Sequence, residues 1–489
     1  MKITPNSKVT FAVVTCAMIA TSCANDVETD INVDPAGNAI NFAPSVGHST
    51  RATETNISNL GDFAVVARGM HHDGVLYDNF LIGSKTEVEI AKRNSLNDET
   101  KPTAGTWVLD RSVYWPTSME KVLFFAYTAL QEGDTYSGTN VLGPTYTDGD
   151  KVKPFFGFDG DNPQISGFKP QKFGVANDGV VNGIWADGQK QNDLLVAYTQ
   201  QERSVSATNV PINFEHALTQ VSITARQNGK LDTDHRIVKI KGAWIVNATE
   251  EGDLTSTPTK SDKDWTFTKT WKTAGFAKTT YGSFYTDIIN LDKDTDWDLL
   301  RQHSLMLIPE NLTAWNKKNG ADNNNGAYIL LLCRVELKHS GTSHSGTNIG
   351  DIAIEGDNHY HQLFPVNEEN YDGAEYGFAC VPLSSDWATK GMGKRYTYNL
   401  NICGNGTGAG VYPPDMDQTY VDKLVPAGTK VSVTGQSDPQ PLKVVTTRPD
   451  KKNVGDFVLD DPIQFTVTVA DWNDLENKDW TEGTGTGTF

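Results

Sequence analysis

Short apolar or alternating segments, separated by Gly, Asn, Asp and Pro, recur along nearly the whole of this 489-residue chain. The pattern is typical of many-stranded β proteins, because each strand needs only a few residues before a turn. Helical periodicity is scarce, and only Thr295–His303 is expected to form a short helix. Repeated strands with little helix favour β-sandwiches over an α/β sheet, so we expect an all-β protein. The expected strands are Ala39–Phe42, Phe63–Ala67, Trp107–Leu109, Val122–Tyr127, Leu194–Tyr198, Val221–Ala225, Ile237–Val246, Leu305–Ile308, Tyr328–Leu337, Tyr376–Val381, Arg395–Ile402 and Ile463–Val469.

The length and the 38% apolar composition allow two or three domains with a sizeable core. A polar, turn-rich stretch, Arg226–His235, separates two apolar strands and predicts a domain boundary near residue 228. We therefore expect one β-sandwich over residues 52–228 and a second over 229–475. Residues 476–489 are polar, alternate Gly and Thr after Glu482 and lack the apolar content needed for a core, so they are expected to form a polar, mobile tail.

The N-terminus reads as an export signal. Lys2 and Lys8 precede an apolar run, Val9–Ala20, which ends in the small residues before Cys23. Cysteine at the cleavage point is typical of a bacterial lipoprotein, which predicts a signal peptide over residues 1–22 and a lipid on Cys23. The alternative is an ordinary signal peptide that happens to contain this cysteine. The apolar run is too short to span a bilayer.

The formal net charge of −19 repels nucleic acid and anionic membranes, so a nucleic-acid partner is not expected. Membrane attachment would have to come from the lipid. The other cysteines outside the leader, Cys333, Cys380 and Cys403, show no CxxC spacing and lie in apolar segments, which favours buried thiols over a zinc site. The alternative is one disulfide between two of these cysteines, formed after export.

No catalytic or metal-binding constellation stands out, and we expect neither an enzyme nor a cofactor. Carboxylates alternate over Asp292–Asp298 as in a calcium loop, but Trp297 and His303 stand where Gly and Glu would be needed. A solvated turn is favoured there, with calcium binding left open. His359 and His361 would lie on one face of a strand, but no third ligand is indicated.

Several motifs, in a shared order, resemble the fimbrillin family of Bacteroidales, the subunits of lipoprotein-derived surface pili. They begin with the Cys23 signal and end near the C-terminus. They are Ile40-Asn-Phe42 with Thr50-Arg51-Ala52, Tyr114-Trp115-Pro116, Leu123–Tyr127, Asp193–Ala197, Phe214-Glu-His216-Ala-Leu218, Leu307-Ile-Pro309, Gly393–Tyr398, and Phe465–Val469 with Asp471-Trp472.

The resemblance implies two tandem β-sandwiches of transthyretin-like, Greek-key type with short helices in loops. It also implies an outer-membrane lipoprotein precursor, processed by signal peptidase II and then cut between Arg51 and Ala52 by a trypsin-like, arginine-specific protease. The cut would remove residues 23–51, including the strand with Ile40 and Phe42.

A strand from another pilin subunit would then fill the opened groove and build a filament at the cell surface. Phe465, Val467 and Val469 form the candidate donor strand, although that strand could instead complete the second sandwich. The role as stalk or tip stays open, as does a host or bacterial surface receptor. The alternative class is a monomeric glycan-binding surface lipoprotein, since the chain has 11 Trp and 16 Tyr.

Overall fold

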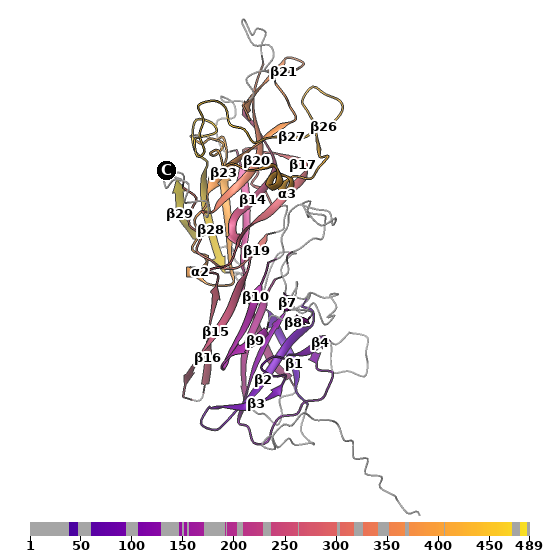
Figure 1. Ribbon diagram of the computed structural model, residues 1–489, viewed down its shortest axis with the longest axis vertical. Helices are drawn as coiled ribbons and strands as arrows, with labels where there is room; N and C mark the ends of the chain where they lie inside the picture. The colour runs from indigo at the N-terminus through magenta and orange to yellow at the C-terminus, as the bar shows by residue number, and fades with distance from the viewer. Residues whose placement is uncertain are drawn as a thin grey trace, which may run out of the picture.

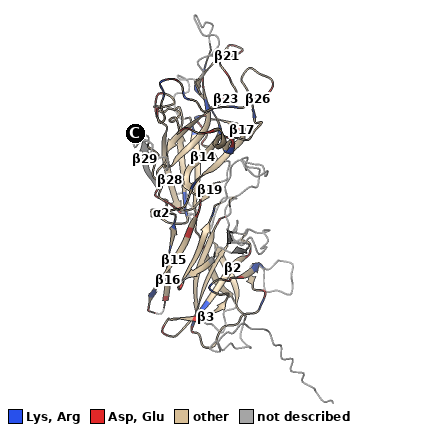
Figure 2. Ribbon diagram, viewed as in Figure 1, with Lys and Arg blue, Asp and Glu red and all other residues tan. Residues whose placement is uncertain are grey.

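The computed structural model shows an elongated molecule, with the N-terminal strands at one end and most of the C-terminal strands at the other (Figure 1). It describes residues 39–46, 60–93, 106–128, 146–148, 151–153, 156–170, 191, 193–202, 209–227, 236–262, 264–300, 304–316, 326–340, 352–366, 371–404, 406–471 and 480–486. Nearly all regular structure is β-strand, which confirms the predicted all-β class. Charged residues of both signs are dispersed over both ends (Figure 2).

The N-terminal end is built on a sheet whose hydrogen-bonded strands close into a ring. The order is β3-β2-β4-β5-β1-β12-β11-β6, and β6 also pairs with β2. The inward side chains of these strands form one apolar cluster that includes Phe42, Phe63 and Phe124. The strands are β1 (Asn41–Val46), β2 (Phe63–Met70), β3 (Leu76–Ile82), β4 (Glu89–Arg93), β5 (Trp107–Val108), β6 (Lys121–Thr128), β11 (Leu195–Glu202) and β12 (Asn209–His216).

A four-stranded sheet lies along the ring (Figure 1). Two of its strands precede β11 in the chain, and the other two follow β14 (Arg236–Thr249). Its strands are β9 (Phe156–Asp159), β10 (Asn162–Phe168), β15 (Gly252–Ser261) and β16 (Asp264–Lys272). On β16, Thr266, Thr268 and Thr270 are exposed, and the alternate residues turn toward the ring. Trp271 Nε1 donates to Ala217 O at 2.7 Å, and Phe267 stacks on Tyr198 with ring centroids 4.8 Å apart. This β15–β16 arm therefore ties the two ends of the molecule together.

The C-terminal end contains two further sheets that share one large apolar cluster. One comprises β13 (Thr219–Arg226), β18 (Trp297–Asp298), β19 (Leu305–Leu307), β24 (Lys394–Asn401), β28 (Gln464–Asp471) and β29 (Trp480–Thr486). The other comprises β14 (Arg236–Thr249), β17 (Lys278–Asn290), β20 (Tyr328–Ser340), β21 (Ile352–Glu355), β22 (Asn358–Phe364), β23 (Glu375–Pro382) and β27 (Lys443–Val445). Two small pairs, β7 (Tyr146–Asp148) with β8 (Lys151–Lys153) and β25 (Lys430–Val431) with β26 (Gln440–Pro441), complete the strands, and the described helices are α2 (Trp387–Lys390) and α3 (Gln418–Leu424).

Strand β20 explains the unbroken apolar run Tyr328–Leu332. Ile329 and Leu331 point into the cluster shared with the β13–β24–β28 sheet. Leu330 and Leu332 point to the opposite side, where Val421 and Leu424 of α3 cover them. A strand covered on both faces loses the apolar–polar alternation of a half-exposed strand.

Strand pairings cross residue 228 in both directions. β13 precedes it and pairs with β24, whereas β15 follows it and pairs with β10. The sheets therefore do not divide at residue 228, and the division into two domains stays a prediction. Residues 480–486 of the predicted tail form β29, which pairs with β28; the composition did not indicate this strand.

The helix predicted over Thr295–His303 is wrong in its described part, where β18 begins at Trp297. Asp292 organises this segment, since its carboxylate accepts hydrogen bonds from the backbone of Asp294 and Thr295. The unpredicted strands β15, β16 and β17 are rich in Thr and Lys, which hides their alternation.

A buried ionic cluster lies on the seven-stranded sheet. Arg334 and Glu336 are both inaccessible to solvent, and Arg334 Nε donates to Glu336 Oε1 at 2.6 Å. Lys239 Nζ lies 2.8 Å from Glu336 Oε2, and the Tyr371 hydroxyl donates to Oε1. Burial alone would raise the pKa of Glu336, but Lys239 and Arg334 hold it below its ordinary value. Arg334 also donates to the backbone carbonyl of Asp372, so the cluster holds the chain before β23.

Replacing Arg334 by Met is expected to lower the free energy of unfolding by about 3–5 kcal/mol, because Glu336 loses a buried countercharge. Urea denaturation followed by tryptophan fluorescence measures the change. The contribution is expected at neutral pH and should be lost as the pH falls below about 4, since the folded pKa of Glu336 is depressed.

Arg236→Met is the matched control. Arg236 pairs with Asp460, whose side chain is 77% exposed, so this change should cost less than about 1 kcal/mol. Equal losses in the two variants would contradict a special role for the buried cluster.

Candidate functional site

Strand β1 lies between β5 and β12 in the N-terminal ring. It pairs in parallel with β12 over six residues, from Asn41 opposite Asn209 to Val46 opposite Phe214. Its other edge pairs with β5 at Phe42 and Trp107, and Ile40 N donates to Val113 O at 2.7 Å. The backbone of β1 is therefore bonded on both sides.

The two residues predicted in the removable strand, Ile40 and Phe42, both lie in the core. Phe42 is fully buried, and Ile40 and Val46 are almost so. The Phe42 ring meets Phe63 and Phe124 edge to face, with centroids 5.7 and 6.0 Å apart. Burying one such side chain stabilises a protein by about 1.5–3 kcal/mol, so Ile40, Phe42 and Val46 together contribute roughly 5–9 kcal/mol.

The opposite face of β1 is partly open to solvent, as is that of its neighbour β12. Asn41 and Ala43 are half-buried, and Ser45 is exposed, with its hydroxyl 2.7 Å from Asn213 Oδ1. β2, by contrast, is buried on both faces. β1 thus lies on the solvent side of the ring, and without it β12 would lose a neighbour along its whole length.

Cys23, Arg51 and Ala52 lie outside the described residues. In the sequence, Arg51 stands between the end of β1 at Val46 and the next described residue, Leu60. A cut after Arg51 would separate β1 covalently from every other described strand. Among the described residues, no helix is long and apolar enough to cross a membrane.

The candidate donor strand is β28, and in this structure it belongs to its own sheet. It pairs with β24 over eight residues and with β29 on its other edge. Phe465, Val467 and Val469 are only half-buried and pack against the C-terminal cluster. The sequence left open whether this strand completes the second sheet, and in the structure it does.

A buried His–Asp pair joins two motifs that sequence reasoning treated separately. His216 Nδ1 lies 2.5 Å from Asp193 Oδ2, and both side chains are excluded from solvent. Asp193 precedes β11 and His216 ends β12, so the pair fixes the two strands that follow β1 in the ring. The available signals were a carboxylate directly before an apolar strand and a histidine that continues the alternating apolar positions Val210, Ile212 and Phe214.

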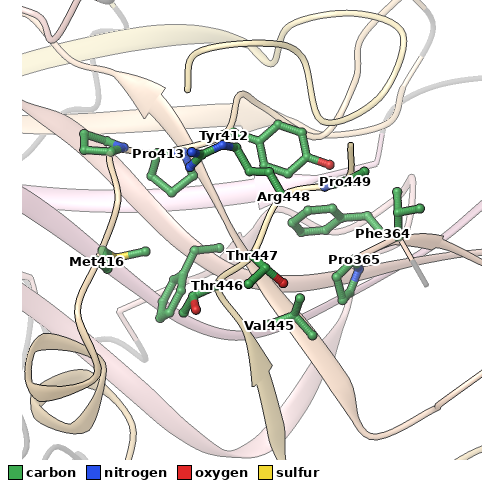
Figure 3. A pocket seen from close by; sticks show the side chains of 13 residues that line it. Phe364, Pro365, Tyr412, Pro413, Met416, Val445, Thr446, Thr447, Arg448 and Pro449 are labelled. Atoms are coloured by element: carbon green, nitrogen blue, oxygen red, sulfur yellow. The ribbon is translucent and has the colours of Figure 1, made fainter. Parts of the chain in front are cut away.

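The pocket in Figure 3 is small and partly open to solvent. Arg448 lies beside Tyr412, and its guanidinium bonds Asp415. Burial raises the pKa of Tyr412 to about 12. The pocket lining is mainly apolar, with Tyr412, two threonines and Arg448 as the polar groups, and it holds no His, Cys or carboxylate.

The segment Asp292–Asp298 uses its carboxylates locally. Desolvation would raise the pKa of Asp292, but hydrogen bonds from Asp294 N, Trp297 Nε1 and Thr295 N lower it below its ordinary value. Asp296 pairs with Arg226 at 3.0 Å. Within the described ranges, no group of three or more His, Cys, Asp or Glu side chains stands ready to hold a metal ion.

The three described cysteines, Cys333, Cys380 and Cys403, are buried free thiols in this structure. Burial raises the pKa of Cys333 and of Cys380, so both stay protonated at neutral pH. Five tryptophans lie in the core instead of forming an exposed platform for sugars. They are Trp107, Trp115, Trp244, Trp315 and Trp387.

Phe42→Ala is expected to lower the free energy of unfolding by about 3–5 kcal/mol, because it empties the centre of the aromatic cluster. Ser45→Ala, on the exposed face of the same strand, is the control and should change it by less than about 0.5 kcal/mol. Urea denaturation of the chain lacking residues 1–22 compares them. If Phe42→Ala were as stable as the control, β1 would not be part of the core.

Comparison with solved structures finds surface proteins of low sequence identity. A fimbrial protein from Bacteroides vulgatus is 15% identical, with 74% of this chain and 94% of that chain covered and a TM-score of 0.39. A putative cell adhesion protein from Bacteroides eggerthii is 12% identical, with 90% and 98% covered and a TM-score of 0.36. One from Parabacteroides distasonis is 11% identical, with 90% and 98% covered and a TM-score of 0.35. No curated protein matches the chain.

The sequence model of the fimbrillin-like family matches residues 50–330, which is more than half of the chain. The match includes the ring strands β2–β6, β11 and β12 and the β15–β16 arm. The chain therefore belongs to the fimbrillin-like family, and it is a pilus-type adhesion subunit, a structural protein and not an enzyme.

Proposed function

We propose that this chain is a stalk or tip pilin that assembles after proteolytic loss of β1. The observation that supports this most is the placement of β1, a core strand of the ring that the chain carries on the N-terminal side of Arg51. A single cut there turns a complete ring into an acceptor. No other described strand precedes Arg51.

Export would come first. Signal peptidase II removes residues 1–22, and the lipid on Cys23 holds the precursor at the outer membrane. A trypsin-like, arginine-specific protease then cuts between Arg51 and Ala52. The same cut frees the subunit from its anchor, because Cys23 and β1 are on the same released segment.

The energetics favour exchange over simple loss. Release of β1 exposes apolar surface whose burial contributes roughly 5–9 kcal/mol. It also leaves β12 with unpaired backbone groups facing the vacated position. An incoming strand would bury this apolar surface again and pair the backbone groups of β12. Binding of a donor strand therefore stabilises the cleaved subunit.

Strand β28 supplies a matching donor. Phe465, Val467 and Val469 repeat at every second residue, the spacing by which Ile40 and Phe42 enter the core. They are half-buried in their own sheet and would be fully buried in the groove. Ladder bonds to β24 and β29 would be exchanged for bonds to β12 and β5, so the gain would have to come from apolar burial. Because the groove and the donor lie on different surfaces, the contact does not close and builds a filament.

A monomeric glycan-binding lipoprotein is the alternative function. It would keep residues 23–51 and its lipid, and would bind polysaccharide without polymerising. Surface adhesion to a host or bacterial receptor is compatible with the pilin.

Arg51→Ala is expected to block maturation and assembly. Cells expressing this variant should retain the lipidated precursor and show at least tenfold fewer filaments by electron microscopy. Arg111→Ala, at an exposed arginine paired with Glu89, is the control and should assemble normally. Normal filaments from Arg51→Ala would refute the cleavage site.

Strand donation is testable by cross-linking between subunits. Asn213 points outward on β12, and Thr468 points away from the apolar face of β28, so cysteines at both positions leave the core intact. After cleavage, Asn213→Cys with Thr468→Cys should give disulfide-linked ladders on a non-reducing gel. The pair Asn213→Cys with Lys430→Cys, at an exposed residue of β25, should not. Filaments that form without any ladder from the first pair would exclude β28 as the donor.

A further inference from the structure

Three histidines gather at the end of the seven-stranded sheet. His339 lies near the end of β20 and pairs directly with His359 of β22, and His361 follows on the same face of β22. The rings of His359 and His361 have centroids 5.3 and 5.1 Å from that of His339. All three side chains are half-buried. Sequence reasoning noted His359 and His361 and lacked a third residue, which strand pairing brings from 20 residues earlier.

Two of the imidazole nitrogens are already at a chelating separation. His339 Nε2 and His361 Nε2 lie 3.0 Å apart. A metal–nitrogen bond of about 2.0–2.1 Å places two imidazole nitrogens about 2.9 Å apart at a right angle and about 3.4 Å apart at a tetrahedral angle. The observed separation lies between these values. Without metal, the same two atoms share a proton in a hydrogen bond.

The third ring requires only a side-chain rotation. His359 stands opposite His339 in the ladder, and such cross-strand neighbours have Cβ atoms about 4.5–5.5 Å apart. Rotamer changes in partly exposed side chains are fast. As the side chains stand, no group of three ligands is in position within the described part of the chain, so His359 has to change its rotamer to join the other two.

The donor set selects the class of ion. Imidazole suits Zn²⁺, Ni²⁺ and Cu²⁺, whereas Ca²⁺ and Mg²⁺ require oxygen ligands. The nearby carboxylate of Glu355 is on the other face of the hairpin, where it accepts a hydrogen bond from Tyr360 at 3.2 Å. Among the described residues, the three histidines offer nitrogen ligands.

We propose that His339 and His361, joined by His359, bind one divalent late transition-metal ion such as Zn²⁺, Ni²⁺ or Cu²⁺. The ion would link the end of β20 to the β21–β22 hairpin. That hairpin lies at the end of the molecule opposite β1 (Figure 1), so the site is independent of strand exchange.

Isothermal titration of the untagged chain lacking residues 1–22, with ZnCl₂ and separately with NiCl₂ at pH 7.5, tests the site. One ion per chain is expected. His339→Gln and His361→Gln should each weaken binding at least tenfold, and His359→Gln about three- to tenfold. Lowering the pH to 5.5 should weaken binding at least tenfold, because protons compete for the imidazoles.

His72→Gln is the control, since His72 is exposed in a turn after β2 and pairs with Glu120. It should bind as the parent does, and circular dichroism should show that all variants are folded. Unchanged affinity in both His339→Gln and His361→Gln, or no heat of binding at millimolar ion, would overturn the site.

Discussion

The N-terminal end depends on the pairing of one strand's backbone. Every buried N–H and C=O of a sheet needs a partner, and a ring of strands satisfies this only while each member is present. β1 supplies the second neighbour of β12 over six residues and the centre of the aromatic cluster. Removing it therefore affects hydrogen bonding and apolar burial at the same place.

Another ring strand, β2, has packing contacts outside the ring that do not involve β1. β2 is buried on both faces: Phe63 and Val65 point into the ring, and Ala64 and Val66 point toward the β15–β16 arm. The arm is held by Trp271 and by the stacking of Phe267 on Tyr198. β1 has no such second cover, because its outer face is partly exposed. Exchange of a strand on this solvent side would leave the packing of the arm in place.

The sequence pattern predicted the strands that contain a continuous or alternating apolar segment. The apolar runs around β6, β14, β20 and β24 were predicted, because an unbroken or alternating apolar segment has few other ways to be satisfied. β15, β16 and β17 were missed, since Thr, Lys, Ser and Asp interrupt their apolar residues and hide the alternation. The helix expected from Thr295 did not form, because Trp297 and Asp298 pair with β13 and Leu299 N donates to Ile223 O instead.

The sequence by itself determined the all-β class, the family motifs and the presence of an apolar strand before Arg51. These features depend on local order along the chain. Only the tertiary structure decided that β1 is a ring member beside β12, that Asp193 meets His216, and that His339 joins His361. Each of these contacts joins residues about 20 to 170 positions apart, and their meeting depends on strand pairing and register, which no local pattern encodes.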